Sequence, residues 1–319
     1  MCQRNNFYGD DDRVENFLDQ KIERKAATII KKIIVTNSLP DIKVDFSEYE
    51  HLITFLLVSE GRNLKIADSV NNLADSLAKT MLKLKKDIDF SHIDIDRYSV
   101  KLNNPANETI SIALSSVPLI FDLEPIIIFQ KTPRKFITSD NPLIRYNSFF
   151  VHRKYHGRGF GYADRGLQLF FPISSDKCLL LYDSLVYDIP GVKDNILYLE
   201  RAREVDFLNE LIYLNSYNNV FFHEKVKEDY LRKIALKNKR TPKLKELERE
   251  IQYFSSNDPN SLLLTSHHNR VTKRINLPWI RLTKHAKQLK LPAHLGGLQR
   301  VESPFIRDFL KEKYESFED

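Results

Sequence analysis

The apolar pattern of this chain changes its period near Pro125. Before that proline, apolar residues recur every three or four positions, which is the period of one face of an α-helix. After it come short runs of β-branched and aromatic residues bounded by turn residues, which is typical of strands. Helices first and strands later, without regular alternation, predict an α+β fold rather than a doubly wound sheet.

The first third of the chain is expected to be a helical lobe. Its first apolar stripe consists of Val14, Leu18, Ile22, Ala26, Ile29 and Ile33. A capping box at residues 47–50 precedes the apolar run 51–58, and further helices are expected over 70–84 and 107–121. We therefore predict two parts: a helical lobe over residues 1–121, and an antiparallel sheet with basic helices over residues 122–319.

The predicted sheet is antiparallel and lies within residues 125–183. Its strands are expected at residues 126–129, 135–138, 143–146, 167–171 and 178–182, with late additions from 220–223 and 262–266. A helix containing Val205 and Leu214 should follow, and a last helix is expected near residues 303–317.

Cysteine content and hydropathy predict the compartment. Cys2 and Cys178 are the only cysteines, so neither a disulfide framework nor a zinc ribbon is expected. The longest apolar run, residues 125–129, is far shorter than the roughly 18–20 residues of a membrane span, and the N-terminus has no apolar signal core. These features predict a cytoplasmic protein that does not enter a membrane.

Positive charge is concentrated in one part of the chain. The whole sequence has a net charge of +6, but residues 225–290 hold 17 lysines and arginines against 6 acids, a local charge of +11. Such a region attracts phosphate backbones and other polyanions. The alternative is a solvated helix surface: Thr241-Pro242 resembles a helix start, and Leu244, Leu247, Ile251 and Phe254 then form a stripe between paired charges.

Several motifs together resemble a known family. They are Lys135-Phe136-Ile137-Thr138-Ser139-Asp140-Asn141-Pro142, the run from Gly166 to Ser174 with Phe170-Phe171-Pro172-Ile173-Ser174, the run Leu179 to Asp183, Phe207-Leu208-Asn209, and Phe7-Tyr8-Gly9 before Val14-Glu15-Asn16-Phe17-Leu18. In this order they resemble the prokaryotic family catalogued as domain of unknown function 4238, over most of the chain. Family members commonly open with a His-His-x-Val-Pro segment, which this sequence lacks. The resemblance implies a fold, and the family has no activity to carry over.

The turn at Ser139-Asp140-Asn141-Pro142 is a candidate for chemistry. It follows a predicted strand, so Asp140 could serve as a general base or metal ligand, with Asn141 orienting a substrate or water. The structural alternative, which we favour, is turn chemistry: Asp and Asn bond their own backbone two residues on, and Pro142 fixes the conformation after them.

Residues 150–166 interleave aromatic rings, cations and four glycines. We expect a flexible loop whose rings stack on bases while arginine and lysine meet phosphates; the alternative is an ordinary long hairpin loop. A glycine-rich loop is not a helix, so His152 and His156 share no face and zinc is not expected here.

Better marked enzyme classes are excluded, since the sequence has no Walker loop, no Gly-x-Ser-x-Gly elbow and no kinase signature. His267 and His268 lack the partners of a ββα-metal nuclease. The leading prediction is binding of nucleic acid or another polyanion. Whether the protein is an enzyme stays open; if it is, phosphodiester hydrolysis is expected at a site where the turn meets the loop. The alternative is a non-enzymatic protein-interaction module of a larger complex. Catalysis would fall to Asp140, Asn141 and His156, and ligand binding to Arg153, Lys154, Arg158 and Arg165. The sequence identifies no metal or cofactor.

Overall fold

The N-terminal part of the protein is helical, as the apolar stripes predicted. The computed structural model describes residues 12–84, 94–153, 159–247, 249–255, 262–268, 270–290 and 299–315. The N-terminal elements are α1 (Arg13–Phe17), the π-helical η1 (Leu18–Glu23), α2 (Arg24–Thr36), α3 (Phe46–Gly61), α4 (Leu64–Leu84), the 3₁₀ turn η2 (Ile95–Arg97), α5 (Pro105–Ser115) and the 3₁₀ turn η3 (Val117–Ile120).

Buried apolar residues and an N-cap residue explain the positions of the helical stretch 18–36 and of α3. Five members of the predicted stripe, Leu18, Ile22, Ala26, Ile29 and Ile33, are buried along η1 and α2. Helix α3 begins earlier than the capping box predicted. Asp45 caps it, because its Oδ1 accepts hydrogen bonds from the Ser47 and Glu48 backbone N–H groups at 2.9 and 3.4 Å.

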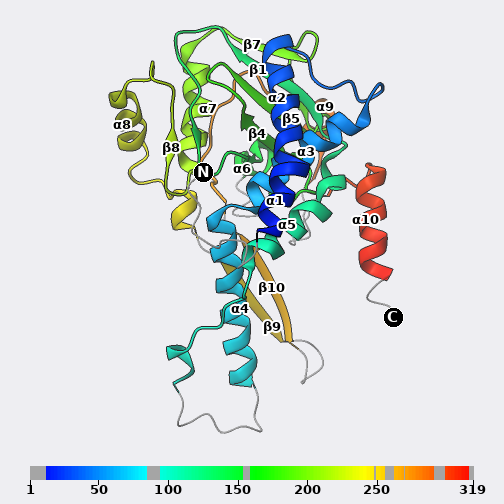
Figure 1. The fold of residues 1–319 in the computed structure, drawn as a ribbon, viewed down its shortest axis with the longest axis vertical. Helices are drawn as coiled ribbons and strands as arrows, with labels where there is room; N and C mark the ends of the chain where they lie inside the picture. Colours follow the sequence, from blue (N-terminus) through cyan, green and yellow to red (C-terminus); the bar gives the residue numbers. More distant parts are fainter. Residues whose placement is uncertain are drawn as a thin grey trace.

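A five-stranded sheet forms the centre of the molecule (Figure 1). Its strands, in spatial order, are β3 (Ile144–Tyr146), β4 (Gln168–Pro172), β5 (Lys177–Tyr182), β1 (Glu124–Gln130) and β7 (Ile196–Leu199). Neighbouring strands are antiparallel, except that β7 runs parallel to β1. The predicted α+β class is therefore confirmed, with one parallel pair that the sequence did not indicate.

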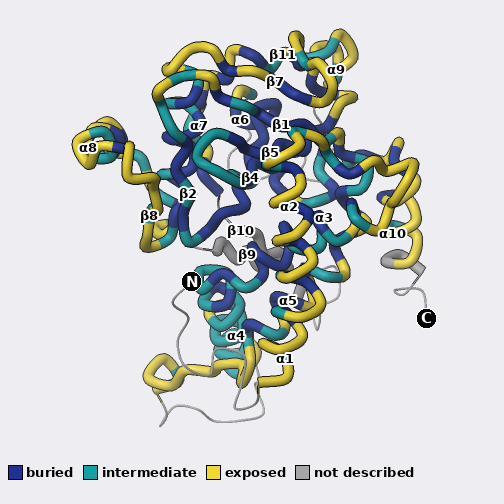
Figure 2. The backbone as a smooth tube through the Cα atoms, turned by 45° about the horizontal axis from the view of Figure 1, so that its top comes forward, coloured by how far each residue is buried: buried dark blue, intermediate teal, exposed yellow. Residues whose placement is uncertain are grey.

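Helical layers cover both faces of this sheet, and the strand alternation assigns each side chain to one of them. On β1, Ile127 faces the core made with α2 and α3, whereas Ile126 and Ile128 face the other core. That second core is completed by α6 (Ser148–His152), α7 (Ala202–Asn215) and the segment 271–279. Figure 2 shows the buried strands between exposed outer surfaces.

The remaining elements are short and lie around this three-layer arrangement. They are β2 (Thr138–Ser139), β6 (Tyr187–Asp188), β8 (Val220–Phe221), α8 (Glu228–Lys237), the 3₁₀ turn η4 (Leu244–Glu246), β9 (Arg249–Ser255), β10 (Leu262–His268), β11 (Arg281–Leu282), α9 (Lys284–Gln288) and α10 (Pro304–Glu315). Helix α4 and the β9–β10 hairpin extend from the same end of the molecule in the view of Figure 1.

Two predictions about the C-terminal strands were wrong. The late strands do not join the central sheet: β8 pairs with β2, and β10 pairs with β9. The strand expected at 135–138 is also outside the central sheet, because only the short β2 forms there. The helix expected after Pro242 is only the turn η4, after which the chain forms β9. Ile251 and Phe254 have a helix-like spacing, but they pair across the hairpin with Ser266 and Leu263. A distant partner strand overrides a local pattern in this way.

A helix can cross a bilayer only if it is long and apolar enough. Among the described residues, none of the helices combines the length and the apolar character that crossing a bilayer requires.

Candidate functional site

Asp140 lies at the end of β2 and holds the chain that leaves α7. Its Oδ1 accepts a hydrogen bond from the Tyr217 N–H at 2.9 Å, and its Oδ2 accepts from the Asn218 and Asn219 N–H groups at 2.7 and 2.9 Å. Charge-assisted bonds of this kind are stronger than neutral ones. The favoured turn interpretation expected bonds to Asp140's own turn, and the carboxylate instead bonds a segment more than 70 residues away.

Asn141 has a comparable structural role one residue later. Its buried side chain donates from Nδ2 to the Asn215 carbonyl at 3.0 Å, at the end of α7. Within the turn, the Ser139 hydroxyl accepts from the Asn141 N–H and donates to the Asn141 carbonyl. Both polar side chains of the motif thus tie β2 to the end of α7, and a catalytic role for either stays a prediction.

The predicted flexible loop at 150–166 begins as a helix. Residues 148–152 form α6, whose N-cap Asn147 accepts a hydrogen bond from the Phe150 N–H at 3.1 Å. Phe150 and Phe160 are buried in the core, so neither ring is available for stacking on a base. Lys154, His156 and Arg158 lie outside the described residues.

Arg153 and Arg165 both bond the protein itself. Arg153 donates to the Phe149 and Ala286 carbonyls, each at 3.2 Å, and its guanidinium lies over the Phe149 ring. Arg165 is buried, and its Nη2 lies 2.6 and 2.7 Å from the two carboxylate oxygens of Glu302. These contacts hold the later segments 286 and 299–302 against the core, and a ligand role for either arginine stays a prediction.

A buried ion cluster that the sequence did not reveal links the helical lobe to the sheet. Glu60 of α3 lies 2.8 Å from Arg145 Nε and 3.0 Å from Arg270 Nη1, and it accepts a hydrogen bond from the Tyr162 hydroxyl at 2.7 Å. Burial would raise the pKa of Glu60, but the two arginines and the Tyr162 hydroxyl outweigh it and lower the pKa to about 2. Glu60 is therefore an anion at neutral pH, shared by two cations.

A second buried carboxylate, Glu210, pairs with two lysines of the basic region 225–290. Glu210 of α7 lies 2.5 Å from Lys237 Nζ and 2.7 Å from Lys273 Nζ. Burial acts to raise the pKa of Glu210, yet the hydrogen bonds from the two lysines lower it below its ordinary value. Two cations of the region 225–290 are thus paired with a buried carboxylate.

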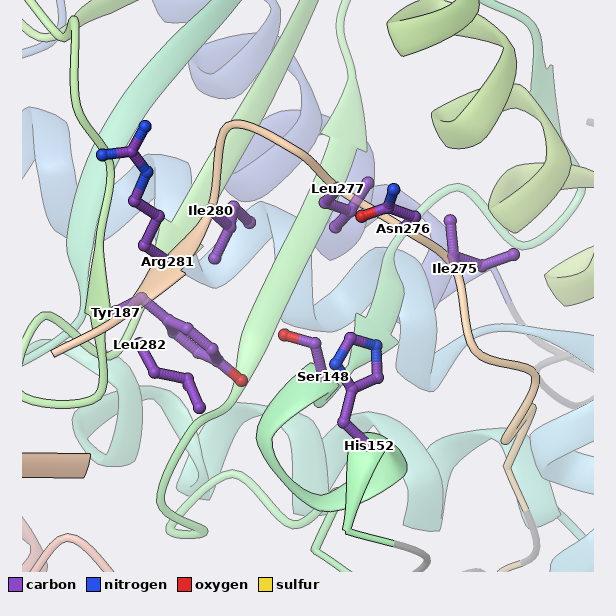
Figure 3. Close-up of a pocket in the computed structure, with 9 residues that line it drawn as sticks. All are labelled: Ser148, His152, Tyr187, Ile275, Asn276, Leu277, Ile280, Arg281 and Leu282. Atoms are coloured by element: carbon purple, nitrogen blue, oxygen red, sulfur yellow. The ribbon is translucent and has the colours of Figure 1, made fainter. Parts of the chain in front are cut away.

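A small pocket opens beside α6, between the sheet and the segment 275–282. Its volume is about 80 Å³, and it is lined by Ser148, His152, Tyr187, Ile275, Asn276, Leu277, Ile280, Arg281 and Leu282. Figure 3 shows the Ser148 and Tyr187 hydroxyls and the His152 ring facing the same space, whereas the Arg281 guanidinium points away from them.

His152 is the residue of this pocket whose ordinary pKa lies closest to neutral pH. Partial desolvation, followed by the nearby Arg274 and Arg153, lowers the pKa of His152, against a hydrogen bond with the Ile275 backbone that raises it. Its imidazole is therefore neutral at pH 7. Asn147, an N-cap residue before the apolar run 149–151, was the sequence signal that could have placed Ser148 and His152 on one helix.

The predicted meeting of the Asp140 turn and the 150–166 loop stays a prediction. The Asp140 carboxylate bonds the N–H groups of 217–219 and its carbonyl accepts from Asn63, whereas Arg153 bonds α6 and α9, and His152 bonds the segment 274–275. The two sets have no residue in common. Within the described parts of the chain, no three side chains of the histidine, cysteine, aspartate or glutamate type gather as a metal site.

Comparison with known proteins places this fold and these motifs in a family. The model of the family described as "Protein of unknown function (DUF4238)" matches residues 1–226, and the chain belongs to that family. No curated protein and no solved structure matches the chain. The His152 pocket is built partly from the matched residues and partly from residues 275–282, beyond the match.

Proposed function

We propose that the protein binds a polyanion, with nucleic acid as the leading ligand, through the exposed surface of residues 270–290. This segment has seven lysines and arginines and no acidic residue. Five of the seven are exposed; they are Arg274, Arg281, Lys284, Lys287 and Lys290, which we call the basic strip. Regularly exposed cations of one sign attract phosphate backbones.

The absence of ion pairs at the basic strip is the observation that carries this proposal. Among the described residues, none of its five cations lies within 4 Å of a carboxylate, although Asp188 is opposite Arg281 in the β6–β11 ladder. The other two cations of the segment, Arg270 and Lys273, pair with Glu60 and Glu210. Five of the seven cations of the segment 270–290 are thus unpaired among the described residues, which is a smaller free charge than the regional +11 suggested.

Salt-dependent binding tests this proposal. A fluorescent single-stranded oligonucleotide should bind with a log affinity that falls linearly with log salt, because phosphate contacts release counterions. Replacing Lys284, Lys287 and Lys290 with glutamine should reduce the slope by about 2, at roughly 0.7 per lost phosphate contact. A flat salt response or no binding would reject the proposal.

A control with the same change in net charge separates local from general attraction. Lys225, Lys227 and Lys233 are also exposed, but acidic residues of α8 and its approach lie among them. Replacing these three with glutamine removes three charges elsewhere and should leave the slope unchanged. An equal loss in both triple variants would mean that binding follows net charge and not the basic strip.

Phosphodiester hydrolysis is a dependent part of the proposal. Asp140, Asn141 and His156 are the residues predicted to carry it, with Arg153, Lys154, Arg158 and Arg165 on the ligand. Hydrolysis should appear as shortened products of a labelled oligonucleotide, with and without added Mg²⁺. A catalytic carboxylate predicts a large loss of product in Asp140→Asn without loss of the fold.

Exposed apolar side chains favour the alternative, a protein-interaction module. Phe46, Phe121 and Phe305 form a row of edge-to-face ring contacts, with centroids 5.0 and 5.5 Å apart, and Phe305 and Phe309 of α10 are 39% and 37% exposed. Exposed apolar patches mark interaction sites. A partner that survives nuclease treatment in a pull-down, and is lost from a Phe305→Ser, Phe309→Ser variant, would support this alternative.

A further inference from the structure

The His152 pocket adjoins the basic strip. Arg281 belongs to both, because its side-chain stem lines the pocket while it lies on β11 directly before α9. Arg274 also borders the pocket: its Nη2 donates to the His152 carbonyl at 3.0 Å. A polyanion lying along the basic strip would therefore bring one of its groups to the pocket.

The size of the pocket limits which group could enter. Its volume of about 80 Å³ is roughly half of the 150 Å³ cavity that accommodates a benzene ring. A nucleobase is larger than benzene and does not fit, and a strand cannot pass through. The pocket suits a compact end group.

The polar groups of the pocket are suited to an anion. Its lining contains no carboxylate, and Ser148 and Asn276 carry hydrogen-bond donors. His152 gains a second N–H only when a bound anion favours its protonation, because the neutral ring has one N–H and already bonds the Ile275 backbone. The Tyr187 hydroxyl is already engaged, since it donates to the Gly166 carbonyl at 2.7 Å and accepts from the Phe149 N–H at 2.9 Å. The α6 side chains that a bound group would use are therefore Ser148, whose hydroxyl bonds Tyr187 in the free protein, and His152 in its protonated form.

We infer that this pocket binds a phosphomonoester, the terminal phosphate of a nucleic-acid strand held on the basic strip. The inference rests on the proposed polyanion binding and adds the kind of strand end that is recognised. A terminal phosphate carries a charge of about −1.5 to −2 at pH 7 and three acceptor oxygens, whereas an internal phosphodiester carries a single charge and is joined on both sides.

Proton linkage follows from the position of His152. In the free protein its surroundings favour the neutral imidazole: Arg274 and Arg153 are the cations that act on it, and Ser148, Tyr187 and the Ile275 backbone are its other polar neighbours. A bound dianion reverses this preference and favours the imidazolium. The preference for a terminal phosphate should therefore grow as the pH falls from 8 to 6.5, where the phosphate still holds most of its second charge.

Three forms of one oligonucleotide test the inference: a 5′-phosphate, a 3′-phosphate and no terminal phosphate, each labelled at the other end or internally. Anisotropy at fixed salt should show at least one phosphorylated form binding about tenfold more tightly than the unphosphorylated form, the effect of two or so charge-assisted hydrogen bonds. Equal affinity of all three forms would overturn the inference and leave the polyanion proposal standing.

Point variants test whether His152 and Ser148 cause the preference for a terminal phosphate. His152→Gln and Ser148→Ala should each reduce the ratio between phosphorylated and unphosphorylated probes, and His152→Gln should also abolish its pH dependence. His223→Gln, at an exposed histidine outside the pocket, should retain both. An unchanged ratio in folded His152→Gln protein would overturn the inference.

Inorganic phosphate distinguishes the two sources of this chemistry. If strand ends are the ligand, phosphate at millimolar concentration should compete with the phosphorylated probe more than with the unphosphorylated one at constant ionic strength. If no oligonucleotide binds, the polyanion proposal fails. Calorimetry with inorganic phosphate would then decide between two outcomes. Phosphate binding that is lost in His152→Gln would show that the pocket is a site for free phosphate. If phosphate does not bind either, the inference is overturned as well.

Discussion

Two groups of cations on the same stretch of chain behave in opposite ways. Arg270 is 7% exposed and shares Glu60 with Arg145, whereas Arg274, only four residues later, is exposed and bonds a backbone carbonyl. Each cation of either group adds one charge to the regional count. Their different surroundings show that charge counted along a sequence does not indicate whether a cation stabilises the fold or faces a ligand.

The buried ions around Glu60 are desolvated when the protein folds, and removing one of them is strongly destabilising. Two arginines and one glutamate leave the Glu60 cluster with a net positive charge in a desolvated site, and each ion loses hydration there. The exposed cations of the basic strip lose none. Removing charge from the first group should therefore change stability, and removing it from the second should change binding.

Glu60→Gln should have the largest effect on this contrast. It leaves Arg145 and Arg270 buried without their anion, which costs about 3–5 kcal/mol in the free energy of unfolding. Urea unfolding followed by fluorescence and circular dichroism measures it. Glu48→Gln is the matched control, because its pair with Lys32 is largely exposed and should contribute below about 1 kcal/mol. Similar losses in both variants would contradict the distinction.

Acid should weaken the same cluster. The pKa of Glu60 in the folded protein, about 2, lies below its ordinary value of 4.5. A lowered pKa stabilises the fold fully above the unfolded value, and the contribution is lost as the pH falls through the folded value. The stability difference between the wild type and Glu60→Gln should thus narrow by about 3 kcal/mol between pH 5 and pH 2. A constant difference across that range would show that Glu60 does not titrate there.

Sequence patterns predicted the parts of the fold that local chemistry determines. The stripe from Leu18 to Ile33 identified a buried helical face, and the apolar runs of β1, β4 and β5 identified the centre of the sheet. The motif around Asp140, followed by the motifs within 166–183, identified the family. Each of these depends on residues close together in the chain.

Partners distant in the chain account for what the sequence missed. Glu60 gave no signal of its own, because its charge is balanced by Arg145 and Arg270 from two other segments. Ile251 and Phe254 kept a helical spacing although their pairing strand decides their structure. His152 was assigned to a loop because glycines follow it in the sequence, and the Asn147 cap that starts α6 was not recognised.

Asp140→Asn should have a smaller effect than the Glu60 change. Asparagine has one acceptor oxygen, so it cannot receive all three N–H groups of residues 217–219, and its amide N–H₂ would face one of them. A loss of about 1–3 kcal/mol in the free energy of unfolding is expected, with oligonucleotide affinity unchanged. Asp229→Asn, at an exposed position on α8, should change stability by less than about 0.5 kcal/mol. A stable Asp140→Asn protein would contradict the holding role.

The smallest expected effects compare single lysines from the two groups. Lys273 bonds Glu210 and Asn238, so Lys273→Met should lower the free energy of unfolding by about 1–2 kcal/mol and leave oligonucleotide affinity unchanged. Lys287 is exposed on α9, so Lys287→Met should change stability by less than about 0.5 kcal/mol and reduce the salt slope of binding by about 0.7. Urea unfolding and an anisotropy titration on both proteins measure the four quantities. Because the two lysines carry the same charge and differ only in their neighbours, a loss of affinity in Lys273→Met equal to that in Lys287→Met would show that the polyanion responds to total charge. In that case the basic strip would not be a defined binding surface.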